Sequence, residues 1–77
     1  MRINIGCLIK DELRRQGHNN AWFADRLGVN VRTVNKIFQK QTIDTQQLYM
    51  ISKVLGRDFF ESYSSELSSD MRNGLAQ

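Results

Sequence analysis

The sequence contains no proline, one cysteine and one histidine among its 77 residues. Because a disulfide needs two cysteines, Cys7 alone excludes an intrachain bridge and a zinc site built from cysteines. A single histidine, His18, offers little for a metal site or a Ser-His-Asp arrangement. The acidic residues are dispersed, and no phosphate-cradling glycine loop occurs. We therefore expect no enzyme activity, no metal and no cofactor.

Long hydrophobic runs are also absent. The apolar runs are only a few residues long, whereas a membrane-spanning helix needs about 20 residues. We therefore expect no membrane segment. Lys10, Asp11 and Glu12 would interrupt the apolar core of an N-terminal signal peptide, so we expect the protein in the cytoplasm.

The composition is that of a small globular domain with a mild excess of positive charge. Hydrophobic residues make up 40% of the chain and charged residues 25%, which is typical of a folded protein. A chain of 77 residues forms one domain at most. The formal net charge of +3 favours an anionic partner.

Apolar residues recur at helical spacing in five stretches, and alternating strand patterns are absent. None of these short helices can bury its apolar stripe alone, so an all-α fold, a compact five-helix bundle, is expected. This domain would comprise residues 1–67, followed by a flexible C-terminal tail over residues 68–77. The expected helices span about residues 4–16, 20–27, 31–39, 44–55 and 58–67.

Polar residues suited to capping precede these helices. Asn30 is placed to cap the third helix, and either Asn19 or Asn20 can cap the second. Two further pairs have the spacing of a capping box. These pairs are Asp44 with Gln47 and Asp58 with Glu61.

The junction of the second and third helices has the residue pattern of a helix-turn-helix. Ala24 has the small side chain needed where two helices cross closely. Gly28 can adopt the left-handed conformation that a sharp turn requires, and Val29 is expected to point back into the core. Val34 and Ile37 would anchor the helix that follows.

The pattern extends to the flanking helices, through Phe23, Leu27, Ile43, Asp44, Leu48, Ile51, Leu55 and Gly56. On these residues the sequence resembles the phage-repressor and Cro-like helix-turn-helix family, also called the xenobiotic-response-element family. The resemblance covers about residues 4–66. It implies a lambda-repressor-like DNA-binding domain whose third helix enters the major groove. The sequence departs from the family pattern at Asn20, usually Gln, and at Phe38, often Glu.

The third helix is expected to have an apolar and a polar side. At about 100° per residue, Val34, Ile37 and Phe38 share one side. Arg32, Asn35, Lys36 and Gln39 then lie on the other side. Arginine can hydrogen-bond a guanine edge with two donors, and asparagine can pair with adenine. The charged residues between Asp25 and Asp44 are all basic, namely Arg26, Arg32, Lys36 and Lys40, and they favour phosphates.

These arguments predict two sets of DNA-contacting residues. Val31 could meet a thymine methyl group or be partly covered beside Phe38, and both alternatives stay open. Asn20 could cap its helix, donate to a phosphate, or do both. The base-contacting set is Val31, Arg32, Asn35 and Lys36. The phosphate-contacting set is Asn20, Thr33, Lys40, Gln41 and Thr42.

A solvated surface position is the alternative interpretation for Arg32, Lys36 and Thr33, and a solvated loop is the alternative for Lys40, Gln41 and Thr42. Trp22 is either a half-buried aromatic against a neighbouring helix or the donor of an indole N–H to a phosphate. Phe59, Phe60 and Tyr63 crowd the fifth helix, so some complete the core and one is available for a dimer contact.

The predicted function is sequence-specific binding of double-stranded DNA by a transcriptional regulator, with repression as the simplest mode of action. Useful affinity in so small a domain usually needs a homodimer on a palindromic site. The alternative is an antitoxin-like module that neutralises a protein partner, with DNA binding as a secondary role.

Overall fold

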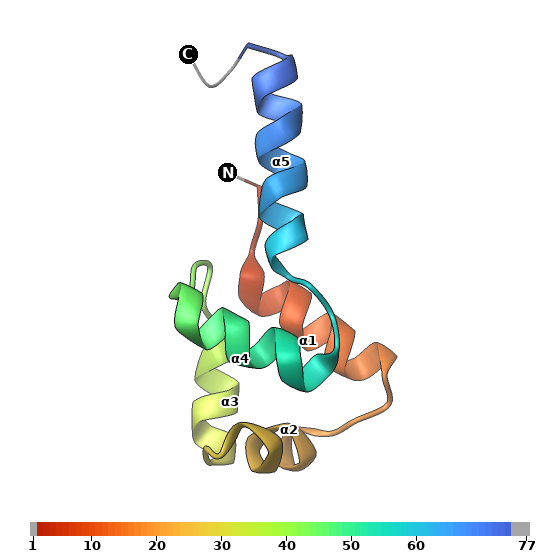
Figure 1. Ribbon diagram of the computed structural model, residues 1–77. Helices are drawn as coiled ribbons and strands as arrows, with labels where there is room; N and C mark the ends of the chain where they lie inside the picture. Colours follow the sequence, from red (N-terminus) through yellow and green to blue (C-terminus); the bar gives the residue numbers. More distant parts are fainter. Residues whose placement is uncertain (1, 75–77) are drawn as a thin grey trace.

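In the computed structural model, which describes residues 2–74, these residues form five α-helices and no strand. This confirms the all-α prediction. Figure 1 shows α1 and α4 in the body of the molecule, α2 and α3 at one end, and α5 at the other. The helices are α1 (Ile5–Arg15), α2 (Asn20–Leu27), α3 (Val31–Phe38), α4 (Thr45–Leu55) and α5 (Phe60–Arg72).

The first four helices begin at polar caps; Asn19, Asn30 and Asp44 were predicted as caps, whereas Asn4 was expected as the first residue of its helix. In each case the side-chain oxygen accepts a hydrogen bond from the backbone N–H three residues further on, which satisfies a donor that the helix itself leaves free. Asn19 caps α2, so the side chain of Asn20 is available for other contacts. The caps are Asn4, Asn19, Asn30 and Asp44.

The core lies among α1–α4 and is closed by Phe59, which precedes α5. Its apolar side chains come from the predicted helical stripes, so the periodicity identified the buried face of each of the four helices. Phe38 differs, because it is only half-buried at the edge of the core. The buried apolar residues are Ile5, Ile9, Leu13, Phe23, Ala24, Val34, Ile37, Leu48, Ile51, Leu55 and Phe59.

Glu12 is a charged residue inside this body, with 4% of its surface exposed. Arg57, in the loop after α4, donates to its carboxylate at 3.0 Å, and Arg15 and Gln16 donate from its own helix. Hydrogen bonds from Arg15, Gln16 and Arg57 lower the pKa of Glu12 to about 2, against the opposing effect of burial. The carboxylate therefore ties α1 to the segment that leads into α5.

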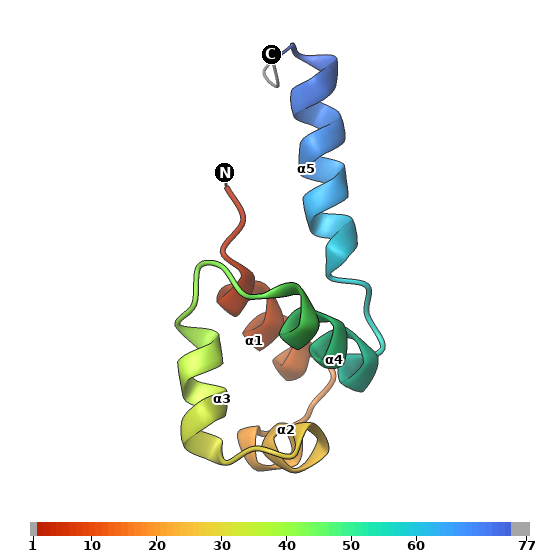
Figure 2. The same cartoon turned by 60° about the vertical axis from the view of Figure 1, so that its left-hand side comes forward.

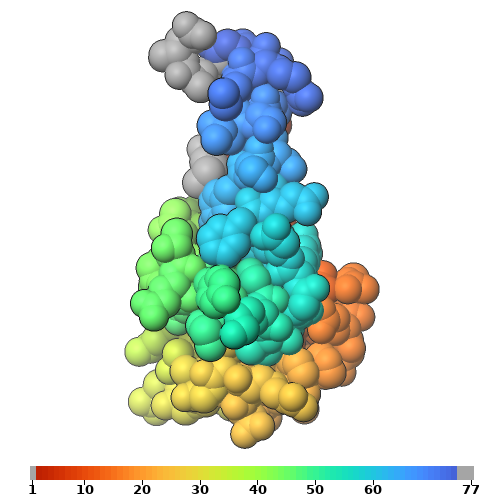
Figure 3. All heavy atoms as spheres, viewed as in Figure 1, coloured from red at the N-terminus to blue at the C-terminus, as the bar shows by residue number. Residues whose placement is uncertain are grey.

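The α5 helix projects from the body, as Figure 1 and Figure 2 both show. The molecule consequently measures 43 × 20 × 19 Å, and the α5 end is narrower than the body in Figure 3. No residue of α5 is buried, although Phe60 and Tyr63 at its start pack against the core. Leu67 and Met71 are 54% and 61% exposed.

The α5 helix differs from its prediction at both ends. It begins at Phe60, whose N–H donates to Asp58 at 3.0 Å, so the predicted capping box of Asp58 and Glu61 was wrong. The helix then continues to Arg72, five residues past the predicted end. Nothing within 68–72 breaks a helix, and an acid in the first turn and a base in the last suit the helix dipole. Residues 75–77 of the predicted tail lie outside the described part of the chain.

Candidate nucleic-acid interface

The α2 and α3 helices are joined by a sharp turn at the end of the molecule remote from α5 (Figure 2). Gly28 has a φ of 73°, a left-handed conformation that a side chain would strain. The N–H of Val29 then donates to the carbonyl of Ala24 at 2.9 Å and completes a glycine-based helix end. Ala24 is buried, and Val29 packs against the core. The turn therefore forms as the residue pattern predicted.

The α3 helix has the predicted two sides. Val34 and Ile37 are 0% and 1% exposed and anchor the helix to the body. The side chains of the polar side all face solvent. Val31, at 42% exposure, is also on the surface, which leaves both of its predicted roles open. The exposed polar residues are Arg32, Asn35, Lys36 and Gln39.

Thr33 is half-buried at the start of α3 and is engaged with its cap. Its N–H and its hydroxyl donate to the side-chain oxygen of Asn30 at 2.9 and 3.1 Å. A phosphate contact through this hydroxyl would have to replace the bond to Asn30. The role of Thr33 at a phosphate stays a prediction.

Asn20 connects three helices through its side chain. Its amide oxygen accepts from Arg14 of α1 at 3.0 Å, and its amide nitrogen donates to the amide oxygen of Asn35 on α3 at 3.1 Å. The structure therefore places a predicted phosphate-contacting residue, Asn20, in direct contact with a predicted base-contacting residue, Asn35.

The loop after α3 carries the other predicted phosphate contacts, Lys40, Gln41 and Thr42, all of them exposed. The backbone N–H groups of Ile5 and Gly6 donate to the carbonyls of Gln41 and Lys40 at 3.2 and 2.8 Å. The start of α1 thus holds the loop beside the end of α3. The Lys40 ammonium group donates to the side chain of Gln47 on α4 at 3.3 Å.

Two further cations, Lys10 and Arg14, border α3, although the sequence pattern did not predict either of them as part of this surface. The charged groups of Lys10 and Arg14 lie 6.0 and 5.9 Å from the centre of the Phe38 ring. Both follow Gly6 at four-residue steps along α1, so they share the side of α1 that meets the end of α3. This spacing is visible in the sequence. It indicates a contact with α3 only once Gly6 is known to lie against the backbone at the end of α3.

Trp22 lies half-buried on α2 and packs against the core, in agreement with one of its two interpretations. Its ring stacks on the His18 ring with centroids 3.5 Å apart and planes 4° apart. The Arg26 guanidinium lies 5.2 Å from the Trp22 ring centre. Donation of the indole N–H to a phosphate stays a prediction.

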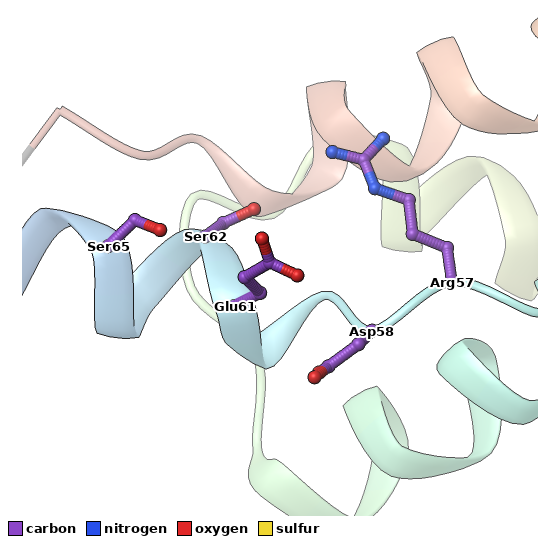
Figure 4. A pocket seen from close by; sticks show the side chains of 5 residues that line it. All are labelled: Arg57, Asp58, Glu61, Ser62 and Ser65. Atoms are coloured by element: carbon purple, nitrogen blue, oxygen red, sulfur yellow. The ribbon is translucent and has the colours of Figure 1, made fainter.

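A separate polar hollow lies beside the start of α5, at the other end of the molecule from α2 and α3. Figure 4 shows Glu61 and Ser62 on the side facing Arg57, whereas the carboxylate of Asp58 points away. Arg57 already binds Glu12, so its charge serves the internal ion pair. The hollow is lined by Arg57, Asp58, Glu61, Ser62 and Ser65.

Within residues 2–74 no group of three or more histidine, cysteine or acidic side chains is placed to hold a metal ion. None of the helices in that range has the length and apolar character needed to cross a membrane. Comparison of the chain with protein-family models, with curated proteins and with solved structures yields no match.

Proposed function

We propose that the protein is a sequence-specific double-stranded DNA-binding regulator of the helix-turn-helix type, with α2 and α3 forming the motif. The observation that carries the proposal is the exposed side of α3, where Arg32, Asn35 and Lys36 stand over the buried anchors Val34 and Ile37. Arginine and asparagine side chains supply the donors and acceptors that distinguish base pairs in the major groove. An α3 of eight residues is about 12 Å long, which suits a groove that admits an α-helix.

The surroundings of α3 support backbone binding. Lys40 lies in the loop after α3, and Lys10 and Arg14 border the end of α3 from α1. Such cations release counterions from DNA when they meet phosphates, which supplies affinity without sequence preference. Membership of the phage-repressor and Cro-like family is part of this proposal, because the residues that carry the resemblance form the α2–α3 turn and its anchors.

The test is binding to duplexes selected from a random-sequence pool, measured over a salt series. Arg32→Ala should weaken binding by about 1–3 kcal/mol and relax the preference at one base position. Lys40→Ala should weaken binding to all sequences alike and lower the salt slope by about one.

Lys53→Ala is the matched control for these variants. Lys53 is exposed on α4 and lines a hollow with Gly56 and Phe60, near the start of α5. Its removal changes the net charge as the other two variants do and should leave binding unchanged. Equal losses in all three variants, or no loss in any, would overturn the proposal.

The second candidate, an antitoxin-like module that neutralises a protein partner, draws its support from α5. Leu67 and Met71 expose more than half of their surfaces, an arrangement typical of a protein contact. The partner is either a second copy, as binding to a palindromic site would require, or a different protein. Sedimentation measures the oligomeric state of the wild type and of the Leu67→Ser variant. If a second copy binds through α5, the wild type should self-associate and the variant should not. If the partner is a different protein, the two should sediment alike.

A further inference from the structure

Three side chains from three helices form one line of hydrogen bonds along the edge of α3. Arg14 donates to the oxygen of the Asn20 amide at 3.0 Å, and the nitrogen of that amide donates to the oxygen of the Asn35 amide at 3.1 Å. Arg14 and Asn35 are exposed and Asn20 is half-buried, so the line runs from the α1 surface to the polar side of α3.

Arg14, the first residue of this line, fixes which groups donate and which accept. A guanidinium has five N–H donors, no acceptor, and stays charged at any ordinary pH. Asn20 must therefore turn its oxygen toward Arg14, which leaves its nitrogen facing Asn35. Since that nitrogen only donates, Asn35 must in turn present its oxygen to Asn20.

We propose that Arg14 and Asn20 are positioning residues that fix which edge of the Asn35 amide faces the DNA, an inference that rests on the proposed function. The Asn35 oxygen is engaged with Asn20, and among residues 2–74 the Asn35 nitrogen forms no hydrogen bond to the protein. The amide therefore offers two N–H donors and one remaining lone pair to a base. Exclusion of water by bound DNA strengthens the line, because hydrogen bonds are stronger at low dielectric.

A donor that is held in place selects a base with a major-groove acceptor. Guanine presents two acceptors and thymine one, whereas cytosine presents only a donor. At the base position read by Asn35, the wild-type protein should therefore bind guanine or thymine about tenfold more tightly than cytosine.

Asn20→Asp tests the direction of the line. The aspartate still accepts from Arg14, but it has no donor, so Asn35 must rotate its amide and donate its nitrogen to the new carboxylate. The base would then meet the Asn35 oxygen, and the preference should shift about tenfold toward cytosine, which presents only a donor. An acid in the first turn of α2 suits the helix dipole, so the variant should fold.

Ala21→Asp is the control for the added negative charge. Ala21 is exposed beside Asn20, so an acid there should weaken binding to every duplex by a similar factor and leave the base ratios unchanged. The base position is identified first as the one whose preference disappears in Asn35→Ala. Arg14→Ala should weaken the preference without reversing it, and Arg14→Lys, which keeps a donor, should restore part of it.

A second readout needs no DNA. In NMR spectra of the free protein, the side-chain amide protons of Asn35 should exchange freely with water in the wild type and become protected in Asn20→Asp. Specific binding whose base ratios are identical in wild type and Asn20→Asp would overturn the positioning role. If the amide protection changes as predicted but neither protein binds DNA specifically, the proposed function and the DNA-reading role of Asn35 are overturned. The donor and acceptor roles assigned to Arg14, Asn20 and Asn35 would still be upheld.

Discussion

Gly6 of α1 lies against the carbonyl oxygen of Phe38 at the end of α3. A Cβ atom at Gly6 would stand 2.4 Å from that oxygen and 2.7 Å from the carbonyl oxygens of Ile37 and Lys40. All three neighbours are backbone atoms, so none can rotate away as the end of a flexible side chain could. This contact joins the start of α1 to the loop that we propose follows the DNA backbone.

Gly6→Ala is therefore expected to lower the free energy of unfolding by about 1–3 kcal/mol or more, although alanine is the better helix former. It should also weaken DNA binding, because the loop that contains Lys40 would be displaced. Denaturant unfolding followed by circular dichroism measures the first effect. Cys7→Ala, at the exposed next position, should leave stability within about 0.5 kcal/mol, and a similarly stable Gly6→Ala would contradict the account.

Glu12→Gln should destabilise the protein by about 1–3 kcal/mol at neutral pH, because charged hydrogen bonds to Arg15 and Arg57 are lost. The folded state holds the pKa of Glu12 at about 2, below its ordinary value of 4.5. The unfolded chain therefore takes up a proton first as the pH falls. The stability that Glu12 contributes is fully present above about pH 4.5 and disappears toward pH 2.

Unfolding curves of the wild type and Glu12→Gln should consequently converge between pH 4.5 and 2. Glu61→Gln serves as control, because Glu61 is exposed and should change stability by no more than about 0.5 kcal/mol. A gap between wild type and Glu12→Gln that stays constant down to pH 2 would show that the carboxylate is not held in its charged form.

Asn30→Ala should cost about 0.5–2 kcal/mol, because the cap of α3 would be lost. The side chain of Asn30 accepts from both the N–H and the hydroxyl of Thr33. Asn30→Ser keeps a capping oxygen and should retain most of the stability. Thermal unfolding of the two variants measures the difference, and equal melting temperatures would remove the assigned role of Asn30.

His18→Ala should expose one face of the Trp22 ring, which now stacks on the imidazole at 3.5 Å. Such an aromatic pair contributes about 0.5–1.5 kcal/mol beyond its buried area. Trp22 is the sole tryptophan, so its emission should shift to longer wavelength as water reaches the ring. Unchanged emission together with unchanged stability would mean that the stack does not persist in solution.

The helices and their caps followed from the sequence because both depend on residues close together in the chain. Asn30 lies directly before its helix, and Val34 and Ile37 are one helical turn apart, so their roles are locally encoded. The polar side of α3 was predictable for the same reason. The predicted end of α5 near Leu67 was wrong, because serines signal a helix end only weakly and no glycine lies between Leu67 and Gly74.

The side chains that other helices place beside α3 could not be predicted from residues close together in the chain. Asn20 and Asn35 are separated by 15 residues, and their contact depends on the angle at which α2 meets α3. The approach of Lys10 and Arg14 to Phe38 depends on the close contact at Gly6. Sequence periodicity identifies which side of a helix is buried but not which helix covers it.

The most direct test of the DNA-binding face is an NMR titration of the 15N-labelled protein with a duplex selected from a random pool. The account predicts that the signals of Arg32, Asn35 and Lys36 shift on binding, together with those of the loop at Lys40, while Leu67 on α5 keeps its position. Shifts confined to α5, with the signals of α3 unchanged, would contradict it.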